Sequence, residues 1–235
     1  MALPKLNTVT YELELPSTAE KLKYRPFLVK EQKSLMIASE SEDDKVIQES
    51  IASIISECTF HKVDPWELPS FDVEYIFLRI RGKSVGEKVK LNLLCPDDEK
   101  TRVEVNVDLT KVNVEMHVGH STEIELTDDV KIIMSYPTLK DVGNIGNIDS
   151  ETEQLFAMLK NCIYQIHEGD TIHQDVDIKE KELDEFIDSL STEHLEKINT
   201  FFETMPKLLH KVKVKNPKTK KTREIVIEGF QSFFV

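Results

Sequence analysis

The sequence predicts an α+β fold: an N-terminal hairpin and helices, then a central antiparallel sheet, then a C-terminal helical segment that ends in a β-hairpin. Three stretches before residue 82 carry apolar residues at three- and four-residue spacing, whereas residues 85–136 carry them at two-residue spacing. These spacings are typical of helices and strands respectively. With 235 residues, of which 40% are hydrophobic, the chain can bury the core of one large domain or two small ones.

The N-terminal region opens with two alternating segments, 11–15 and 21–25, on either side of a turn that begins at Pro16. This arrangement predicts a β-hairpin. Helices are expected over 27–39 and 43–58, and a third after Pro69. We expect the third helix to stop near Gly82, because glycine commonly ends a helix.

The central region alternates apolar residues with charged or polar ones. The alternating apolar positions are Val89, Leu91, Leu93, Val103, Val105, Val107, Val112, Val114, Met116, Ile124, Leu126, Val130, Ile132 and Met134. Such alternation predicts an antiparallel sheet with one face on a core.

A Gly- and Asn-containing stretch, 141–149, is the expected boundary between a domain over 1–140 and a segment over 150–235. Helices are expected over 151–167, 179–190 and 192–205, of which the first begins at the N-cap residue Ser150 and the last at Ser191 or Thr192. Alternating lysines and valines on either side of an Asn-Pro turn then predict the terminal hairpin.

Charge is distributed unevenly along a chain whose net charge is −13. Between Asp149 and Glu203 there are 15 acidic residues against 4 lysines, a net of −11. From Lys207 onward there are 8 basic residues against 2 glutamates, a net of +6. This contrast indicates either self-complementary packing or two differently charged docking surfaces. The overall acidity argues against nucleic acid as a partner.

The composition also limits the compartment and the chemistry. The three cysteines, Cys58, Cys95 and Cys162, are far apart and predict reduced, partly buried thiols rather than a disulfide framework. No apolar run is long enough to cross a bilayer, and no apolar signal stretch opens the chain, so we expect a cytoplasmic protein without a membrane partner.

Signatures of enzymes are missing from the sequence, which has no Gly-rich phosphate loop, nucleophile elbow or His-Glu-x-x-His motif. We therefore expect no enzyme, no cofactor and no metal. The alternative is a metal-dependent hydrolase that uses His117, His120 and Glu115, although polar residues at a strand end are the favoured interpretation of these three.

The hairpin turns at Cys95-Pro96 and Asn216-Pro217 have the same form: a strand, an x-Pro turn, a lysine and a second strand. This form resembles the knuckle of a zinc ribbon, but only Cys95 could supply a thiolate. We expect both hairpins to be held by strand pairing, without zinc.

Several stretches in series resemble a tail-protein family of T-even-type contractile phages, the baseplate hub subunit or hub assembly proteins. The matching stretches are 13–18, 24–31, 68–78, 81–87, 136–138 and 227–234. The resemblance implies a structural or assembly role in the baseplate hub. It also implies other hub and tail proteins as partners, and a location in the host cytoplasm during assembly or in the virion tail afterwards. Copy number, oligomeric state and direct partners do not follow from it.

Within these stretches the arginines, one lysine and several aromatic residues are candidates for partner contacts, because arginine suits specific interface pairing. The candidate residues are Tyr24, Arg25, Phe27, Arg79, Arg81, Lys83, Phe230, Phe233 and Phe234. The alternative is that these segments only determine the fold, since Phe71, Tyr75, Ile76 and Phe77 would be core residues in any case.

Overall fold

The computed structural model describes residues 7–41, 43–145 and 148–229 and has the expected α+β architecture. The chain divides into two compact units. Unit 1 combines residues 1–115 with residues 207–235, and unit 2 consists of residues 116–206. Unit 2 is thus inserted into unit 1. The chain leaves unit 1 at Glu115 and returns at Lys207, and these two residues are paired partners in neighbouring strands.

The division between these units differs from the one expected at 141–149. That stretch lies inside unit 2, and part of it forms helix α4 (Leu139–Ile145). The physical reason is strand pairing over a long sequence distance. Because β10 (Lys207–Lys215) pairs with β5 (Asn113–Glu115), the last strands belong with the first half of the chain.

Unit 1 begins with the expected hairpin of β1 (Tyr11–Glu14) and β2 (Lys21–Tyr24), in which Leu13 lies opposite Leu22. Three helices follow: α1 (Val29–Glu40), α2 (Asp44–Cys58) and α3 (Ser70–Val85). The side chain of Asp43 caps α2 by accepting from the backbone N–H groups of Lys45 and Val46. The cap satisfies donors that the first helical turn leaves unpaired.

Helix α3 extends three residues beyond the stop expected at Gly82. Gly82 lies inside the helix, and Gly86 ends it with a backbone φ of +135°. A side chain would be strained in that conformation, so the second glycine, rather than the first, provides the termination.

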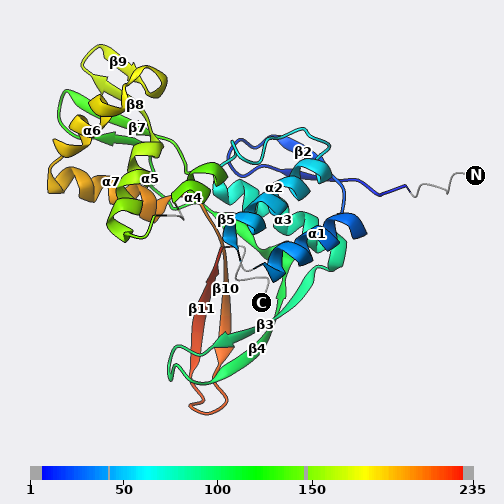
Figure 1. Cartoon of the computed structure of the whole chain (residues 1–235). Coiled ribbons are helices and arrows are strands. Elements are labelled where there is room, and N and C mark those ends of the chain that lie inside the picture. The colour runs from blue at the N-terminus through cyan, green and yellow to red at the C-terminus, as the bar shows by residue number, and fades with distance from the viewer. Residues whose placement is uncertain (1–6, 42, 146–147, 230–235) are drawn as a thin grey trace, which may run out of the picture. The chain divides into compact units, whose positions relative to one another are not determined.

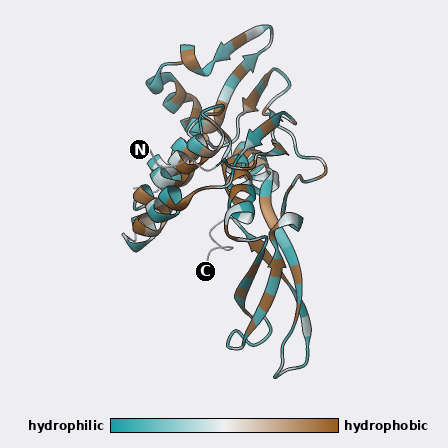
Figure 2. Ribbon diagram, turned by 90° about the vertical axis from the view of Figure 1, so that its right-hand side faces the viewer, coloured by the Kyte–Doolittle hydropathy of each residue, from teal (hydrophilic) through white to brown (hydrophobic). Residues whose placement is uncertain are grey.

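Two long hairpins complete unit 1. β3 (Lys88–Leu94) pairs with β4 (Arg102–Asp108), and β10 pairs with β11 (Thr222–Glu228). The short helix η1 (Leu109–Lys111) leads from β4 into β5, which extends the second hairpin to the sheet order β11-β10-β5. The two hairpins run side by side (Figure 1) and show alternating apolar and polar bands along their strands (Figure 2).

The inner faces of the hairpins share a core with α3. The buried members of this core are Leu78, Leu91, Val107, Leu109, Val112, Leu208 and Ile227. Each strand therefore presents one face to apolar neighbours and the other to solvent, as the two-residue periodicity predicts.

Unit 2 contains an antiparallel sheet in the order β6-β7-β8-β9, with helices packed against it. The strands are β6 (Glu123–Glu125), β7 (Val130–Met134), β8 (Ile163–Glu168) and β9 (Thr171–Gln174). The helices, besides α4, are α5 (Glu151–Cys162), η2 (Asp175–Asp177), α6 (Glu180–Asp188) and α7 (Thr192–Thr204). The core includes Ile132, Leu159, Cys162, Ile198 and Phe201.

Two expectations about this region were wrong. The helix expected over 151–167 ends at Cys162, and the following residues form β8. The prediction failed because buried Ile163 and Ile166 continue the apolar spacing of the helix. The strands between residues 85 and 136 do not form one sheet but belong to three separate ones. The N-caps Ser150 and Ser191 are confirmed.

Candidate functional site

The tips of the two long hairpins have similar local geometry, although the turn from Cys95 to Thr101 is one residue longer than the turn from Asn216 to Lys221. In each tip the first residue donates its backbone N–H to the residue that closes the turn: Cys95 to Thr101 at 2.8 Å, and Asn216 to Lys221 at 2.9 Å. Each tip also has one non-glycine residue at positive φ, Glu99 at 50° and Lys220 at 62°. The similarity of the two turns in sequence therefore reflects a similarity in backbone.

The two tips are joined by side-chain hydrogen bonds. Asn216 donates its amide to Asp97 at 3.0 Å, and the Thr219 hydroxyl donates to the second carboxylate oxygen of Asp97. The bonds from Thr219 and then from Asn216 hold the pKa of Asp97 below its usual range. Asn216 is almost fully buried, and its side-chain oxygen Oδ1 accepts from the backbone N–H groups of Lys218 and Thr219. The tips thus form one interlocked end.

At the position of a zinc-ribbon thiolate, Cys95 is a buried free cysteine whose thiol pKa is raised by burial and then by Asp97 and Asp98. Among the residues that the structure describes, no three His, Cys, Asp or Glu side chains form a group that could hold a metal ion. Strand pairing holds each hairpin together, and the side-chain hydrogen bonds to Asp97 connect the two tips.

The outer face of the β10–β11 hairpin is strongly basic. Lys211, Lys213 and Lys215 alternate on β10 with the inward valines, and the tip adds further lysines. Lys211 pairs with Glu115 at 2.8 Å. Within the described ranges no ion pair involves the remaining lysines, which are Lys213, Lys215, Lys218, Lys220 and Lys221. We call these five lysines, with the exposed Val226 that lies opposite Lys211, the basic face. Arg223 lies opposite the buried Val214 and therefore on the inner side of the hairpin.

Most of the candidate partner residues serve the fold of unit 1. Tyr24 and Phe27 are buried, with 3% and 8% of their surface exposed. Arg25 forms an ion pair of 2.8 Å with Glu31, and both side chains are largely covered. Burial opposes the ionisation of Glu31, but bonds from Arg25 and from the Leu28 N–H outweigh it and lower the pKa.

The basic candidates on α3 are likewise engaged. Arg79 donates to the carbonyl oxygens of Leu109 and Val112 at 2.7 and 2.8 Å and so fixes the turn around η1. Arg81 is half-buried, and burial lowers its pKa. Lys83 pairs with Glu87 and lies over the Tyr11 ring. Partner contact through these residues stays a prediction, and Phe230, Phe233 and Phe234 lie outside the described residues.

Two of the three residues of the alternative hydrolase site, His120 and Glu115, already have partners elsewhere in the fold. Both ring nitrogens of His120 are hydrogen-bonded, Nδ1 to Thr204 at 2.9 Å and Nε2 to the Tyr136 hydroxyl at 3.1 Å. His117 is exposed, and Glu115 pairs with Lys211. Burial, followed by the charge of His117, lowers the pKa of His120. His120 therefore ties the loop before β6 to α7.

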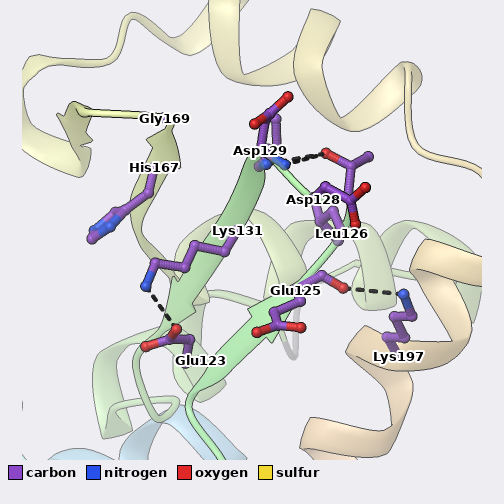
Figure 3. A pocket seen from close by; sticks show the side chains of 11 residues that line it. Glu123, Glu125, Leu126, Asp128, Asp129, Lys131, His167, Gly169 and Lys197 are labelled. Atoms are coloured by element: carbon purple, nitrogen blue, oxygen red, sulfur yellow. Dashed lines mark hydrogen bonds and ion pairs between the residues drawn. The ribbon is translucent and has the colours of Figure 1, made fainter.

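Unit 2 has an open polar depression of about 500 Å³ between β6, the β6–β7 turn, β8 and α7 (Figure 3). Lys131 pairs with Glu123 at 2.7 Å, and Lys197 donates to the Glu125 carbonyl oxygen at 3.1 Å. The side chains of Asp128 and Asp129 lie at the turn, away from both lysines (Figure 3). The lysines are thus already committed within the fold, and the depression is a solvated acidic surface.

A second depression in unit 2, of about 340 Å³, combines an apolar floor with an acidic rim. Ile166, Ile178 and Phe186 line the floor, and the rim carries Glu168, Asp177 and Glu182. We call these six residues the acidic groove. The segment around it, 168–188, has 9 acidic residues against 2 lysines, a net charge of −7. Sequence reasoning found this acidity but not the groove, because β8, η2 and α6 form the groove only in the folded chain.

A family model described as T4 bacteriophage base plate protein matches residues 8–235. The chain belongs to this family, and it is a phage baseplate protein. Comparison with curated proteins and with solved structures gives no match. Among the described helices, none has both the length and the apolar character needed to cross a membrane.

Proposed function

We propose that this protein is a component or assembly factor of the baseplate hub, that it acts through protein–protein contacts, and that it carries out no catalysis. The observation that supports the proposal most is the match of the baseplate family over residues 8–235, nearly the whole chain. A baseplate is an assembly within the phage tail, so its proteins work by contact with other tail proteins.

The organisation of the chain is consistent with this role. Unit 1 is stiffened by two hairpins that share a core and are joined again at their tips. Such an element keeps its surface in a fixed geometry, which lowers the entropic cost of binding a partner. The exposed charges on the basic face suit a partner with an acidic surface, because complementary charges give specificity and speed association.

The hub role is tested by purification of a tagged chain from infected cells, followed by identification of the tail proteins that come with it. We expect hub proteins to be enriched over proteins of the outer baseplate. Equal recovery of both, or recovery of outer proteins alone, would contradict the hub assignment while leaving the baseplate family intact.

Permanent and transient roles are separated by mass spectrometry of purified virions. Abundant peptides from this chain would make it a subunit of the finished particle. Their absence from virions, together with enrichment in hub intermediates from infected cells, would make it an assembly factor.

The non-catalytic part of the proposal has its own test. We expect metal analysis of the purified chain to give no stoichiometric zinc or manganese. A stoichiometric metal that disappears in His120→Ala but persists in His210→Ala would instead support the metal-dependent hydrolase with His117, His120 and Glu115.

A further inference from the structure

The basic face and the acidic groove are complementary surfaces on the same chain, and each lies on a different unit. Unit 2 carries 20 acidic residues against 6 lysines, a net charge of −14, so unit 1 carries +1 of the total of −13. The strands of the terminal hairpin, with their turn, hold a net of +6. The charge asymmetry of the sequence is therefore an asymmetry between two folded surfaces.

The basic face is an unpartnered sheet face within the described part of the chain. Its lysines alternate with valines that point into the core, so the strand pairing fixes their direction. Lys213 lies opposite Glu224, and Lys211 opposite Val226, which is 50% exposed. Val226 is thus an exposed apolar side chain on the same face as the alternating lysines.

The acidic groove has the shape and chemistry that a lysine side chain needs. A lysine has an apolar four-carbon stem and a charged head, and it binds best where the stem meets apolar surface and the head meets carboxylates. The floor of Ile166, Ile178 and Phe186 can receive the stem. On the rim, Asp177 has no ion-pair partner among the described residues, while Glu182 forms an ion pair with Lys179.

An exposed apolar residue beside the groove matches the apolar part of the basic face. Val176 on η2 is 80% exposed and is the neighbour in sequence of the groove residue Asp177. Ile172 is 55% exposed, but it lies opposite His167 and so on the other face of the sheet from Ile166. The two surfaces therefore pair charge with opposite charge and also pair exposed apolar side chains, two features that together favour association in water.

We propose that this chain associates with a second copy of itself, head to tail, by docking the tip of the β10–β11 hairpin into the acidic groove of the neighbouring molecule. Lys218, Lys220 and Lys221 supply the cations, since they lie at the tip. The tip is about 30 Å along β10 from Lys207, because nine residues of strand each span about 3.4 Å. The tip thus lies at the far end of the hairpin from Lys207.

The contact is heterologous, because two different surfaces meet. Heterologous contacts produce a ring where the rotation closes and a filament where it does not. The proposal rests on the proposed function in one respect: a protein of a symmetric tail gains from a contact that repeats around the axis.

The test is sedimentation velocity of the purified chain over a concentration series at about 50 mM and about 500 mM salt. We expect concentration-dependent association that weakens at high salt, because screening acts on exposed charges. The tip variant Lys218→Glu/Lys220→Glu/Lys221→Glu should weaken association by about tenfold or more, since like charges then face one another. The control variant, Lys33→Glu/Lys45→Glu/Lys62→Glu, makes the same charge change at exposed lysines elsewhere and should associate normally.

A charge-reversal experiment on both surfaces tests whether the hairpin tip binds the acidic groove. The groove variant Glu168→Lys/Asp177→Lys/Glu182→Lys should be monomeric alone, as should the tip variant, but a mixture of the two should associate. Asp128→Lys/Asp149→Lys/Glu203→Lys, which reverses three exposed acids of unit 2 outside the groove, is the matched control and should behave as the unaltered chain. Circular dichroism of each variant verifies that it is folded.

Three outcomes would overturn the proposal. The first is a chain that stays monomeric at every salt and concentration. The second is a mixture of tip and groove variants that does not associate. The third is a monomeric chain that a duplex DNA probe retains at physiological salt through Lys218, Lys220 and Lys221. If the unaltered chain is monomeric in solution and is nevertheless recovered with hub proteins from infected cells, self-association fails while the hub role stands.

Discussion

Asn216 donates its side-chain amide to Asp97 at 3.0 Å, across 119 residues of sequence, and so joins the tip of one hairpin to the tip of the other. The inserted unit 2 accounts for most of that separation. The contact is therefore formed only when both ends of unit 1 have come together. It makes the tip region a sensitive reporter of whether the two hairpins are assembled correctly.

Replacement of Asn216 by alanine should lower the free energy of unfolding by about 2 kcal/mol. The change removes the bond to Asp97 and the two bonds from Lys218 and Thr219, and a hydrogen bond typically contributes about 1 kcal/mol. Urea denaturation followed by circular dichroism measures the difference. Asn106→Ala, at an exposed position of β4, is the control and should change stability by less than about 0.5 kcal/mol. Equal effects of the two substitutions would show that the tips are not joined in solution.

Acidification should separate the tips before it unfolds the rest of unit 1. Bonds from Thr219 and Asn216 lower the pKa of Asp97 in the folded state, so the stability that they provide is complete above the unfolded value of about 3.9. That stability is lost as the pH falls through the folded pKa. The measurement is the stability difference between the unaltered chain and Asp97→Asn as a function of pH. It should shrink below about pH 4, and a constant difference would count against the folded-state bonds.

The order of the elements and the fold class were predictable from the sequence because they depend on local periodicity. The helices at 43–58 and 192–205 were placed within two residues, since their apolar spacing and their caps agree. Strand β8 was assigned to a helix because Ile163 and Ile166 are three residues apart, which is a helical spacing. A register shift in the pairing of β7 with β8 allows both residues to be buried in a strand, so helix and strand can each accommodate them. What decides between them is pairing with β7 and β9, which no local pattern contains.

The grouping of strands into sheets could not be predicted for the same reason. Strand β5 follows β4 closely along the chain, yet it pairs with β10. The paired residues Glu115 and Lys207 are 92 positions apart in the sequence. Of the candidate surface, the charge contrast was visible in the sequence, and so was the similarity of the hairpin turns. The bonds of Asp97 and the acidic groove depend on contacts between distant segments.

Arg25 should behave as a residue of the fold. Its replacement by methionine removes the ion pair to Glu31 and leaves a largely covered carboxylate with fewer partners, so we expect a loss of about 2–3 kcal/mol. Thermal or urea unfolding measures it. Lys23→Met, at an exposed position of β2, is the matched control and should be nearly neutral. An Arg25→Met chain of unchanged stability that loses a tail-protein partner would instead assign Arg25 to an interface.

The three thiols should be unreactive in the folded chain. Burial raises the pKa of Cys58 to about 11 and that of Cys162 to about 12, and Cys95 is also buried, so little thiolate is present or accessible at pH 8. A chromogenic thiol reagent should modify none of them in minutes, and all three after denaturation in guanidinium. Rapid modification of one thiol in the native protein would reveal local opening of the core around it.

His120 should make stability fall below about pH 6.5. Burial, and then the neighbouring charge of His117, lowers its pKa in the folded state. The unfolded chain therefore takes up the proton more readily, and the stability present above the unfolded value of about 6.5 is lost as the pH falls toward the folded pKa. Nuclear magnetic resonance titration of the His120 ring measures the folded pKa directly. The variant His117→Asn removes one of the two causes and should move that pKa upward. An unchanged pKa in His117→Asn would leave burial between Tyr136, Thr204 and Phe201 as the whole cause.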